Sequence, residues 1–163
     1  MLTEKKILIV DDDVDVINIA QTILENEGHT VLVANGKDEA LAILKNEKPD
    51  IAVLDVMMNT QFEGFELAEA IKTNEYYKNI IVLMQTSIEV FESPDEDAMR
   101  FARNYRANMK DSSLDVLLVT DPKTGTAGVD YRNENGKIVW LPIDGFIRKP
   151  VKAQNLLETL NRF

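Results

Sequence analysis

Polar side chains follow four of the apolar runs in this sequence, at the points where the runs end. They are Asp11 and Asp12, Asp55, Thr86 and Lys149. Clustered carboxylates raise one another's pKa unless a cation shares the site, and oxygen ligands without histidine or cysteine favour a hard cation such as Mg²⁺. A carboxylate can also act as a nucleophile toward phosphorus. These residue types predict Mg²⁺-assisted phosphoryl transfer, with positive charge from Lys149 and a hydroxyl from Thr86.

Each of these residues also has a structural interpretation. The run Asp11–Asp13 is typical of a solvated turn that caps the helix following it. Lys149 and Pro150 could end a strand without any further role, and Thr86 could be a buried hydroxyl bonded to the backbone. The functional interpretation therefore depends on whether the fold brings Asp55 and Lys149 to the acidic run.

Alternating apolar runs and amphipathic segments predict the elements that position these side chains. Short apolar runs predict strands at 7–10, 30–34, 51–54, 80–84 and 145–148. Apolar residues at helical spacing predict helices over 14–27, 37–47, 64–72, 95–110 and 153–160. Such strand–helix repeats imply a doubly wound α/β fold, a five-stranded parallel sheet with helices on both faces. Ligand sites in these folds lie beyond the carboxyl ends of the strands, where the polar residues are found.

The stretch between the fourth predicted helix and the fifth strand breaks this alternation. The fourth and fifth strands lie farther apart than the roughly 20–25 residues that a helix, two loops and a strand need. Within 111–143, residues 115–120 predict a strand and 129–141 a hairpin turning at Asn133–Gly136. We interpret 111–143 as a β-rich insertion in a single domain over 1–163, because it is too small for a core of its own.

Composition and charge exclude several classes of protein. Hydrophobic residues make up 45% and charged residues 28% of the 163 residues, and no apolar run reaches the roughly 20 residues of a membrane span. A net charge of -10 argues against direct binding of nucleic acid through a basic surface. The absence of cysteine excludes disulfides, thiolate zinc sites and a cysteine nucleophile. The first residues lack the apolar core of a signal peptide, so we expect a cytoplasmic protein.

Four motifs resemble those of the response-regulator receiver family of two-component signalling. Val10–Asp12 resembles the family's acidic pair, Val53–Met58 its acceptor strand, Gln85–Ser87 its Thr/Ser switch and Phe146–Pro150 its Lys-Pro motif. The resemblance covers about 1–110 and 144–163. It implies a flavodoxin-like sheet with the strand order 2-1-3-4-5, as in chemotaxis regulators.

The resemblance also implies a metal site. Mg²⁺ would be bound by Asp55, by Asp12 directly and by Asp11 mostly through water. The backbone carbonyl of Met57 would complete the protein ligands.

The same resemblance implies a switch rather than an enzyme. A histidine kinase or histidine phosphotransfer protein would phosphorylate Asp55, and the added charge would draw Thr86 and Lys149 inward. Phe146 would take the place of the family's aromatic rotamer switch. A downstream protein or a second copy of the chain would then bind the face made by the fourth helix, fifth strand and fifth helix.

Three positions depart from the family or bear on the lifetime of the phosphoryl group. Asn59 stands where the family usually has proline, and the loop from Asn59 to Gly64 carries one extra residue. Met57 and Ile88 lie two residues beyond Asp55 and Thr86 and are apolar. Because neither side chain can orient an attacking water, we predict slow self-dephosphorylation.

Two other functions share some of these features. A receiver-like module that binds proteins without phosphorylation would tolerate the altered Asn59 loop and the insertion. A Mg²⁺-dependent aspartyl-phosphate hydrolase uses the same group types, but its nucleophile follows the first strand in an Asp-x-Asp-x-Thr/Val pattern. Asp11–Asp15 lacks the final Thr/Val, and Asp55 follows the third strand.

Overall fold

The computed structural model describes residues 3–60, 62–94, 97–108 and 115–163. Both ends of the predicted helix 95–110, and residues 111–114 of the predicted insertion, lie outside these ranges. The chain forms two compact units. The first comprises Met1–Ser87 and Ile147–Phe163, and the second comprises Ile88–Phe146.

The first unit is built on a five-stranded sheet with the order β2-β1-β3-β4-β9. Its strands are β1 (Lys6–Val10), β2 (Thr30–Ala34), β3 (Ile51–Asp55), β4 (Ile81–Thr86) and β9 (Gly145–Arg148). β1 pairs in parallel with β2 and β3, and β3 pairs in parallel with β4. The predicted fold class is confirmed, including the strand order and the presence of a separate β-rich region.

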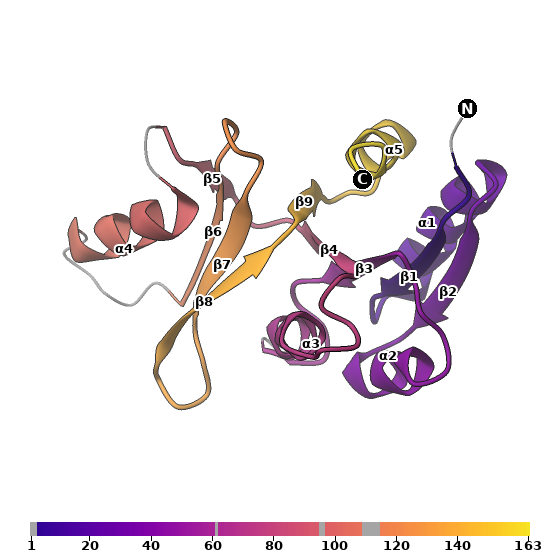
Figure 1. Ribbon diagram of the computed structural model, residues 1–163, viewed down its shortest axis with the longest axis horizontal. Helices are drawn as coiled ribbons and strands as arrows, with labels where there is room; N and C mark the ends of the chain where they lie inside the picture. The colour runs from indigo at the N-terminus through magenta and orange to yellow at the C-terminus, as the bar shows by residue number, and fades with distance from the viewer. Residues whose placement is uncertain (1–2, 61, 95–96, 109–114) are drawn as a thin grey trace. The chain divides into compact units, whose positions relative to one another are not determined.

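Helices cover both faces of this sheet, as Figure 1 shows. They are α1 (Val14–Asn26) and α5 (Ala153–Leu160) on one face, and α2 (Lys37–Leu44) and α3 (Glu63–Lys72) on the other. The strands are apolar on both sides because both faces are covered, and every residue of β3 is buried. The longest of these helices, α1, has 13 residues, and no helix in the described ranges has the length and apolar character of a membrane span.

The second unit has its own sheet, with the order β5-β6-β7-β8. Its elements are β5 (Val90–Glu92), α4 (Ala98–Asn108), β6 (Val116–Thr120), β7 (Ala127–Arg132) and β8 (Ile138–Ile143). β7 and β8 pair antiparallel, and the turn between them closes with a hydrogen bond from Gly136 N to Asn133 O. Gly136 has a φ of +79°, a conformation that favours glycine.

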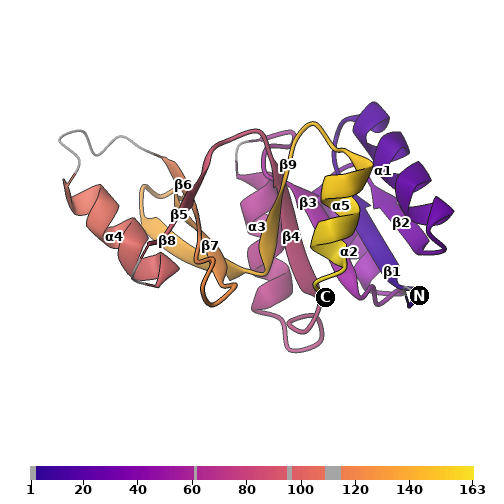
Figure 2. The ribbon, with the colours of Figure 1, turned by 90° about the horizontal axis from the view of Figure 1, so that it is seen from above.

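The helix α4 packs against this second sheet (Figure 2). Ala98 and Ala102 form a small apolar cluster with Leu117 and Val119 of β6. The sequence places this helix before the insertion, as the fourth helix of the main fold. In the structure the second unit starts at Ile88, ahead of α4, because the buried face of this helix packs against β6.

A buried ion pair also joins α4 to the second sheet. Asp130 of β7 is fully buried, and its carboxylate accepts a hydrogen bond from Arg106 Nε. Arg106 Nη2 also donates to the backbone oxygen of Asp130 at 2.8 Å. Arg103 Nη2 lies 3.5 Å from the other carboxylate oxygen, within ion-pair range but outside hydrogen-bond geometry. These contacts fix α4 on β7.

Candidate functional site

The strand ends of the first unit bring the predicted site residues to one edge of the sheet. Asp11 directly follows β1, Asp55 ends β3, Thr86 ends β4 and Lys149 directly follows β9. Asp11 is fully buried and Asp55 is only 5% exposed. Two carboxylates with so little access to water need a compensating positive charge.

Lys149 supplies that charge. Its Nζ lies 3.1 Å from Asp11 Oδ2 and 3.1 Å from Asp55 Oδ1. Lys149 N also donates to the backbone oxygen of Thr86 at 2.9 Å, which holds the end of β9 beside the end of β4. The contact joins groups that are far apart in the chain, so the fold brings Asp11, Asp55 and Lys149 together.

The surroundings shift the ionisation of both partners. Burial raises the pKa of Asp55 to about 6, and the negative charge of Asp11 adds to this, while hydrogen bonding and attraction from Lys149 oppose it. Burial alone would lower the pKa of Lys149, but the hydrogen bonds and charges of Asp55 and Asp11 outweigh it and raise this pKa above its ordinary value. Lys149 is therefore positively charged at neutral pH, and Asp55 is mostly ionised.

The acidic side chains form a group that could hold a metal ion. Asp11, Asp12 and Asp55 each offer a carboxylate oxygen, and these oxygens lie within 4.8 Å of one another. Asp12 is exposed, whereas the other two carboxylates are buried. The donor set is all oxygen, which suits a hard cation with some water ligands retained on the exposed side. The residues present therefore fit a site of this kind.

The acidic run also caps a helix, but the capping residue is Asp13 and not one of the run's two candidate metal ligands. Asp13 is the N-cap of α1, and its side chain accepts a hydrogen bond from Asp15 N at 2.9 Å. Asp13 N in turn donates to Asp11 Oδ1 at 2.9 Å. The three consecutive aspartates thus have different tasks, since Asp13 starts the helix and its backbone orients the buried carboxylate of Asp11.

The remaining predicted residues are Met57, Thr86 and Phe146. Met57 has a 54% exposed side chain, and its backbone N donates to Asp55 Oδ1 at 3.4 Å. Thr86 is buried, 2% exposed, at the end of β4. Phe146 is half-buried in β9 and falls in the second unit. The hydroxyl role of Thr86, the switch role of Phe146 and the carbonyl role of Met57 stay predictions.

Two residues near the site have positions that the sequence interpretation missed. Gly64 lies in the first turn of α3, where any Cβ would overlap the backbone oxygens of Asp55 and Val56. Glycine is therefore required for the helix to approach the acceptor strand this closely. Gln85 is buried and pairs with Asp55 across β3 and β4. A polar residue directly after four apolar ones in β4 was the feature of the sequence that could have indicated a role for Gln85.

If the acidic group binds Mg²⁺, the raised pKa of Asp55 predicts that the affinity for the cation falls as the pH drops through about 6. Above this pH the carboxylate of Asp55 is ionised, and below it a proton competes with the cation. The other charged groups that face Asp55 are Asp11, Asp12 and Lys149. We expect an affinity about tenfold lower at pH 5 than at pH 7 by isothermal titration calorimetry.

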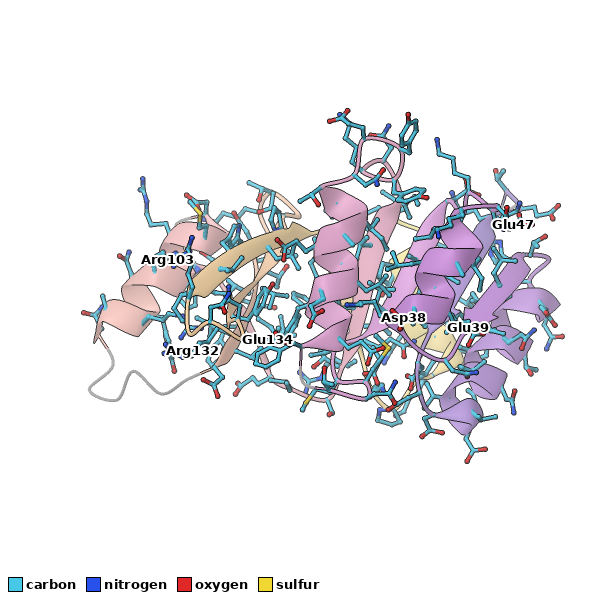
Figure 3. The ribbon with its side chains drawn as sticks, turned by 90° about the horizontal axis from the view of Figure 1, so that it is seen from below. Asp38, Glu39, Glu47, Arg103, Arg132 and Glu134 are labelled. Carbon is cyan, nitrogen blue, oxygen red and sulfur yellow. The ribbon has the colours of Figure 1, made fainter. Side chains whose placement is uncertain are left out.

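The matched control is Asp38→Asn, which removes an equal charge from an exposed position on α2 (Figure 3). This variant should keep both the affinity and its pH dependence. Equal Mg²⁺ affinity of the wild-type protein at pH 5 and pH 7 would mean that a proton on Asp55 does not compete with the cation in this range.

Comparison with known proteins identifies a domain family. The model of the response regulator receiver domain matches residues 7–101, which is more than half of the chain. The chain is 37% identical over 79 residues to the alkaline phosphatase synthesis transcriptional regulatory protein PhoP of Bacillus subtilis (strain 168), covering 48% of this chain and 32% of that protein. The chain spans about a third of the length of the first curated relatives that it matches.

Two further similarities extend over nearly the whole chain. Histidine kinase 5 of Arabidopsis thaliana is 25% identical over 161 residues, covering 99% of this chain and 16% of that protein. The structure of the chemotaxis response regulator CheY4 of Vibrio cholerae matches with a TM-score of 0.63 at 23% identity, covering 98% of both chains. This structural similarity supports the fold.

Proposed function

The chain belongs to the response regulator receiver family of two-component systems, and we propose that it is a phosphorylation-driven switch whose phosphoryl acceptor is Asp55. The observation that carries this proposal is the position of Lys149 Nζ, 3.1 Å from the carboxylates of both Asp55 and Asp11. A buried carboxylate with an ammonium group at its side is suited to accept an anionic group, because the positive charge stabilises the incoming negative charge.

The chemistry proposed for Asp55 is nucleophilic attack on phosphorus. An ionised oxygen of Asp55 forms a bond to the phosphorus of a phosphohistidine, the phosphorus–nitrogen bond breaks, and its electron pair stays on the histidine nitrogen. Lys149 stabilises the negative charge of the phosphoryl oxygens during transfer. The protein is then the acceptor of the group and promotes its own phosphorylation, rather than turning over a separate substrate.

We assign a Mg²⁺ site to Asp11, Asp12, Asp55 and the backbone carbonyl of Met57. Mg²⁺, when bound, neutralises charge on the phosphoryl oxygens. The three carboxylates support this assignment because their oxygens lie within 4.8 Å of one another.

Intact-mass spectrometry after incubation with acetyl phosphate tests the proposed function. We expect one phosphoryl group on the wild-type protein, only when Mg²⁺ is present, and none on Asp55→Asn. The matched control Asp50→Asn removes a carboxylate that lies just before β3 and should be phosphorylated like wild type. No adduct on folded wild-type protein that binds Mg²⁺ would instead favour a protein-binding module that works without phosphorylation.

The exposed side chain of Met57 predicts a long-lived phosphoryl group. Met57 follows Asp55 by two residues and has no group that can orient a water toward phosphorus. We expect Met57→Asn to shorten the lifetime of the phosphoryl group about tenfold or more, because an amide can hold the attacking water. The lifetime is followed by intact mass after acetyl phosphate is removed.

The control for this prediction is Met57→Leu, which keeps an apolar side chain of similar volume. It should leave the lifetime unchanged. A lifetime that is already short in the wild-type protein would contradict the prediction, since water would then be oriented without Met57.

We propose that the partners are a histidine kinase or a histidine phosphotransfer protein upstream, and a downstream protein or a second copy of the chain. In the family the readout face comprises the fourth helix, fifth strand and fifth helix. In this chain α4 belongs to the second unit, whereas α5 belongs to the first. Only Ser87–Glu89 separates β4 from β5, and only Asp144 separates β8 from β9. Because β4 leads directly into Ile88–Phe146 and β9 follows directly from it, we propose one domain over 1–163 in which this inserted unit takes part in the readout.

A further inference from the structure

The buried amide group of Gln85 lacks the hydrogen bonds that a buried polar group normally makes within the described part of the chain. Gln85 lies in β4 and is 1% exposed. Among the residues that the structure describes, neither its amide nitrogen nor its amide oxygen has a hydrogen-bond partner. Buried amide groups in native proteins almost always have partners, so an exception needs a physical reason.

Strand alternation places Gln85 on the same face of the sheet as the candidate site. Side chains two residues apart on a strand share a face. Four residues of one apolar cluster are each followed, two positions later in the chain, by a polar residue. The pairs, with the apolar residue first, are Ile9 and Asp11, Val53 and Asp55, Leu83 and Gln85, and Ile147 and Lys149. Gln85 therefore occupies, on β4, the position that Asp11, Asp55 and Lys149 occupy on or after the other strands.

The path of the Lys149 side chain brings it past Gln85. In the sheet order, β4 lies between β9 and β3, and Gln85 is the β4 residue paired with Asp55. Lys149 follows β9, yet its Nζ reaches Asp55 on β3. The side chain must therefore cross the end of β4, on the face that carries Gln85.

Phosphorylation would change what the ammonium group of Lys149 contacts. An ammonium group has three protons, and Asp11 and Asp55 accept from it in the unphosphorylated state. When Asp55 becomes an acyl phosphate, its negative charge moves outward to the phosphoryl oxygens, and Nζ is drawn after it. The hydrogen bond to the Asp55 carboxylate is then replaced by one to a phosphoryl oxygen, and the shift of Nζ lets its third proton, which neither carboxylate accepts, reach a neighbouring acceptor.

We propose that Gln85 is a positioning residue for the phosphorylated state, in which its carboxamide oxygen accepts a hydrogen bond from Lys149 Nζ and holds the ammonium group against the phosphoryl oxygens. This inference rests on the proposed function of Asp55. It explains why a strand buried on both faces carries an amide that has no partner among the described residues of the unphosphorylated protein.

Beryllofluoride, which mimics a phosphoryl group on a carboxylate, provides the test. We expect Gln85→Met, which has a similar length but no amide, to bind beryllofluoride in the presence of Mg²⁺ roughly tenfold more weakly than wild type, as measured by ¹⁹F NMR. Its Mg²⁺ affinity and thermal stability without beryllofluoride should not fall, because the amide makes no hydrogen bond to any described part of the chain in that state. Gln154→Met, at an exposed position on α5, is the matched control.

A second measurement needs no substitution. In the wild-type protein, the side-chain carbonyl ¹³C signal of Gln85 should shift on beryllofluoride binding in the direction expected for a newly accepted hydrogen bond. An unmoved signal, or equal beryllofluoride affinity of wild type and Gln85→Met, would overturn the role of Gln85 and leave Asp55 as the acceptor. Failure of the wild-type protein to bind beryllofluoride would overturn both.

Discussion

Replacing Lys149 with methionine is expected to slow phosphorylation of Asp55 by acetyl phosphate about 100-fold, because it removes a positive group aimed at the developing charge. Nζ lies 3.1 Å from Asp55 Oδ1, and methionine keeps most of the side-chain length without the charge. The loss of Lys149 also removes the interactions that lower the pKa of Asp55. That pKa would then rise above about 6, and less of the nucleophile would be ionised at neutral pH.

The matched control for this substitution is Lys152→Met. Lys152 is exposed at the start of α5, and its side chain makes no capping hydrogen bond, so the variant loses the same charge three residues away from Lys149. The rate is read from the growth of the phosphoryl adduct in intact-mass spectra, with Mg²⁺ saturating for each variant. If folded Lys149→Met were phosphorylated as fast as wild type, the ammonium group would have no part in the transfer.

The site could be predicted from sequence because of a general property of parallel sheets. Their carboxyl ends meet at one edge, so polar residues that directly end apolar runs are brought together whatever their separation along the chain. Asp11, Asp55 and Lys149 each follow such a run, and the structure places them in direct contact. The order of the strands came from the resemblance to a family and not from the apolar pattern itself.

Gln85 could not be assigned to the site by the same reasoning. β4 is covered on both faces, so Val82, Leu83 and Met84 are all buried and the sequence shows no alternation of apolar and polar residues. Without that alternation, the face to which Gln85 belongs is hidden. Only the pairing of β4 with β3 and the membership of Leu83 in the apolar cluster reveal it.

The packing of α4 was beyond sequence reasoning for a related cause. An amphipathic pattern shows which face of a helix is buried but does not show which sheet covers it. The buried face of α4 consists of the small residues Ala98 and Ala102, which form an apolar cluster with β6. The partly buried Phe101 and Tyr105 pack against this cluster. The three-residue strand β5 is likewise too short to give a periodic signal.

Replacing Asp130 with asparagine is expected to destabilise the second unit by about 3–5 kcal/mol, the usual result of removing one partner of a buried ion pair. The carboxylate of Asp130 is fully buried, and Arg106, whose side chain is 13% exposed, donates to it from α4. Asparagine keeps the shape but not the charge, so the guanidinium group of Arg106 loses its buried counter-charge. Arg103 is 45% exposed and contributes little, because water screens its charge.

The same sheet offers a control that differs mainly in burial. Arg132 of β7 forms an ion pair with Asp115 at 3.3 Å, but Asp115 is 60% exposed (Arg132 and Arg103 are labelled in Figure 3). Asp115→Asn should therefore cost about 1 kcal/mol or less. Hydrogen exchange of the amides in β6, β7 and β8 measures both effects, and amides in β1 and β3 report on the first unit. Equal losses of protection in the two variants would show that burial does not decide the strength of these ion pairs. Loss confined to β6–β8 in Asp130→Asn would show that the second unit can unfold while the sheet that carries Asp55 stays intact.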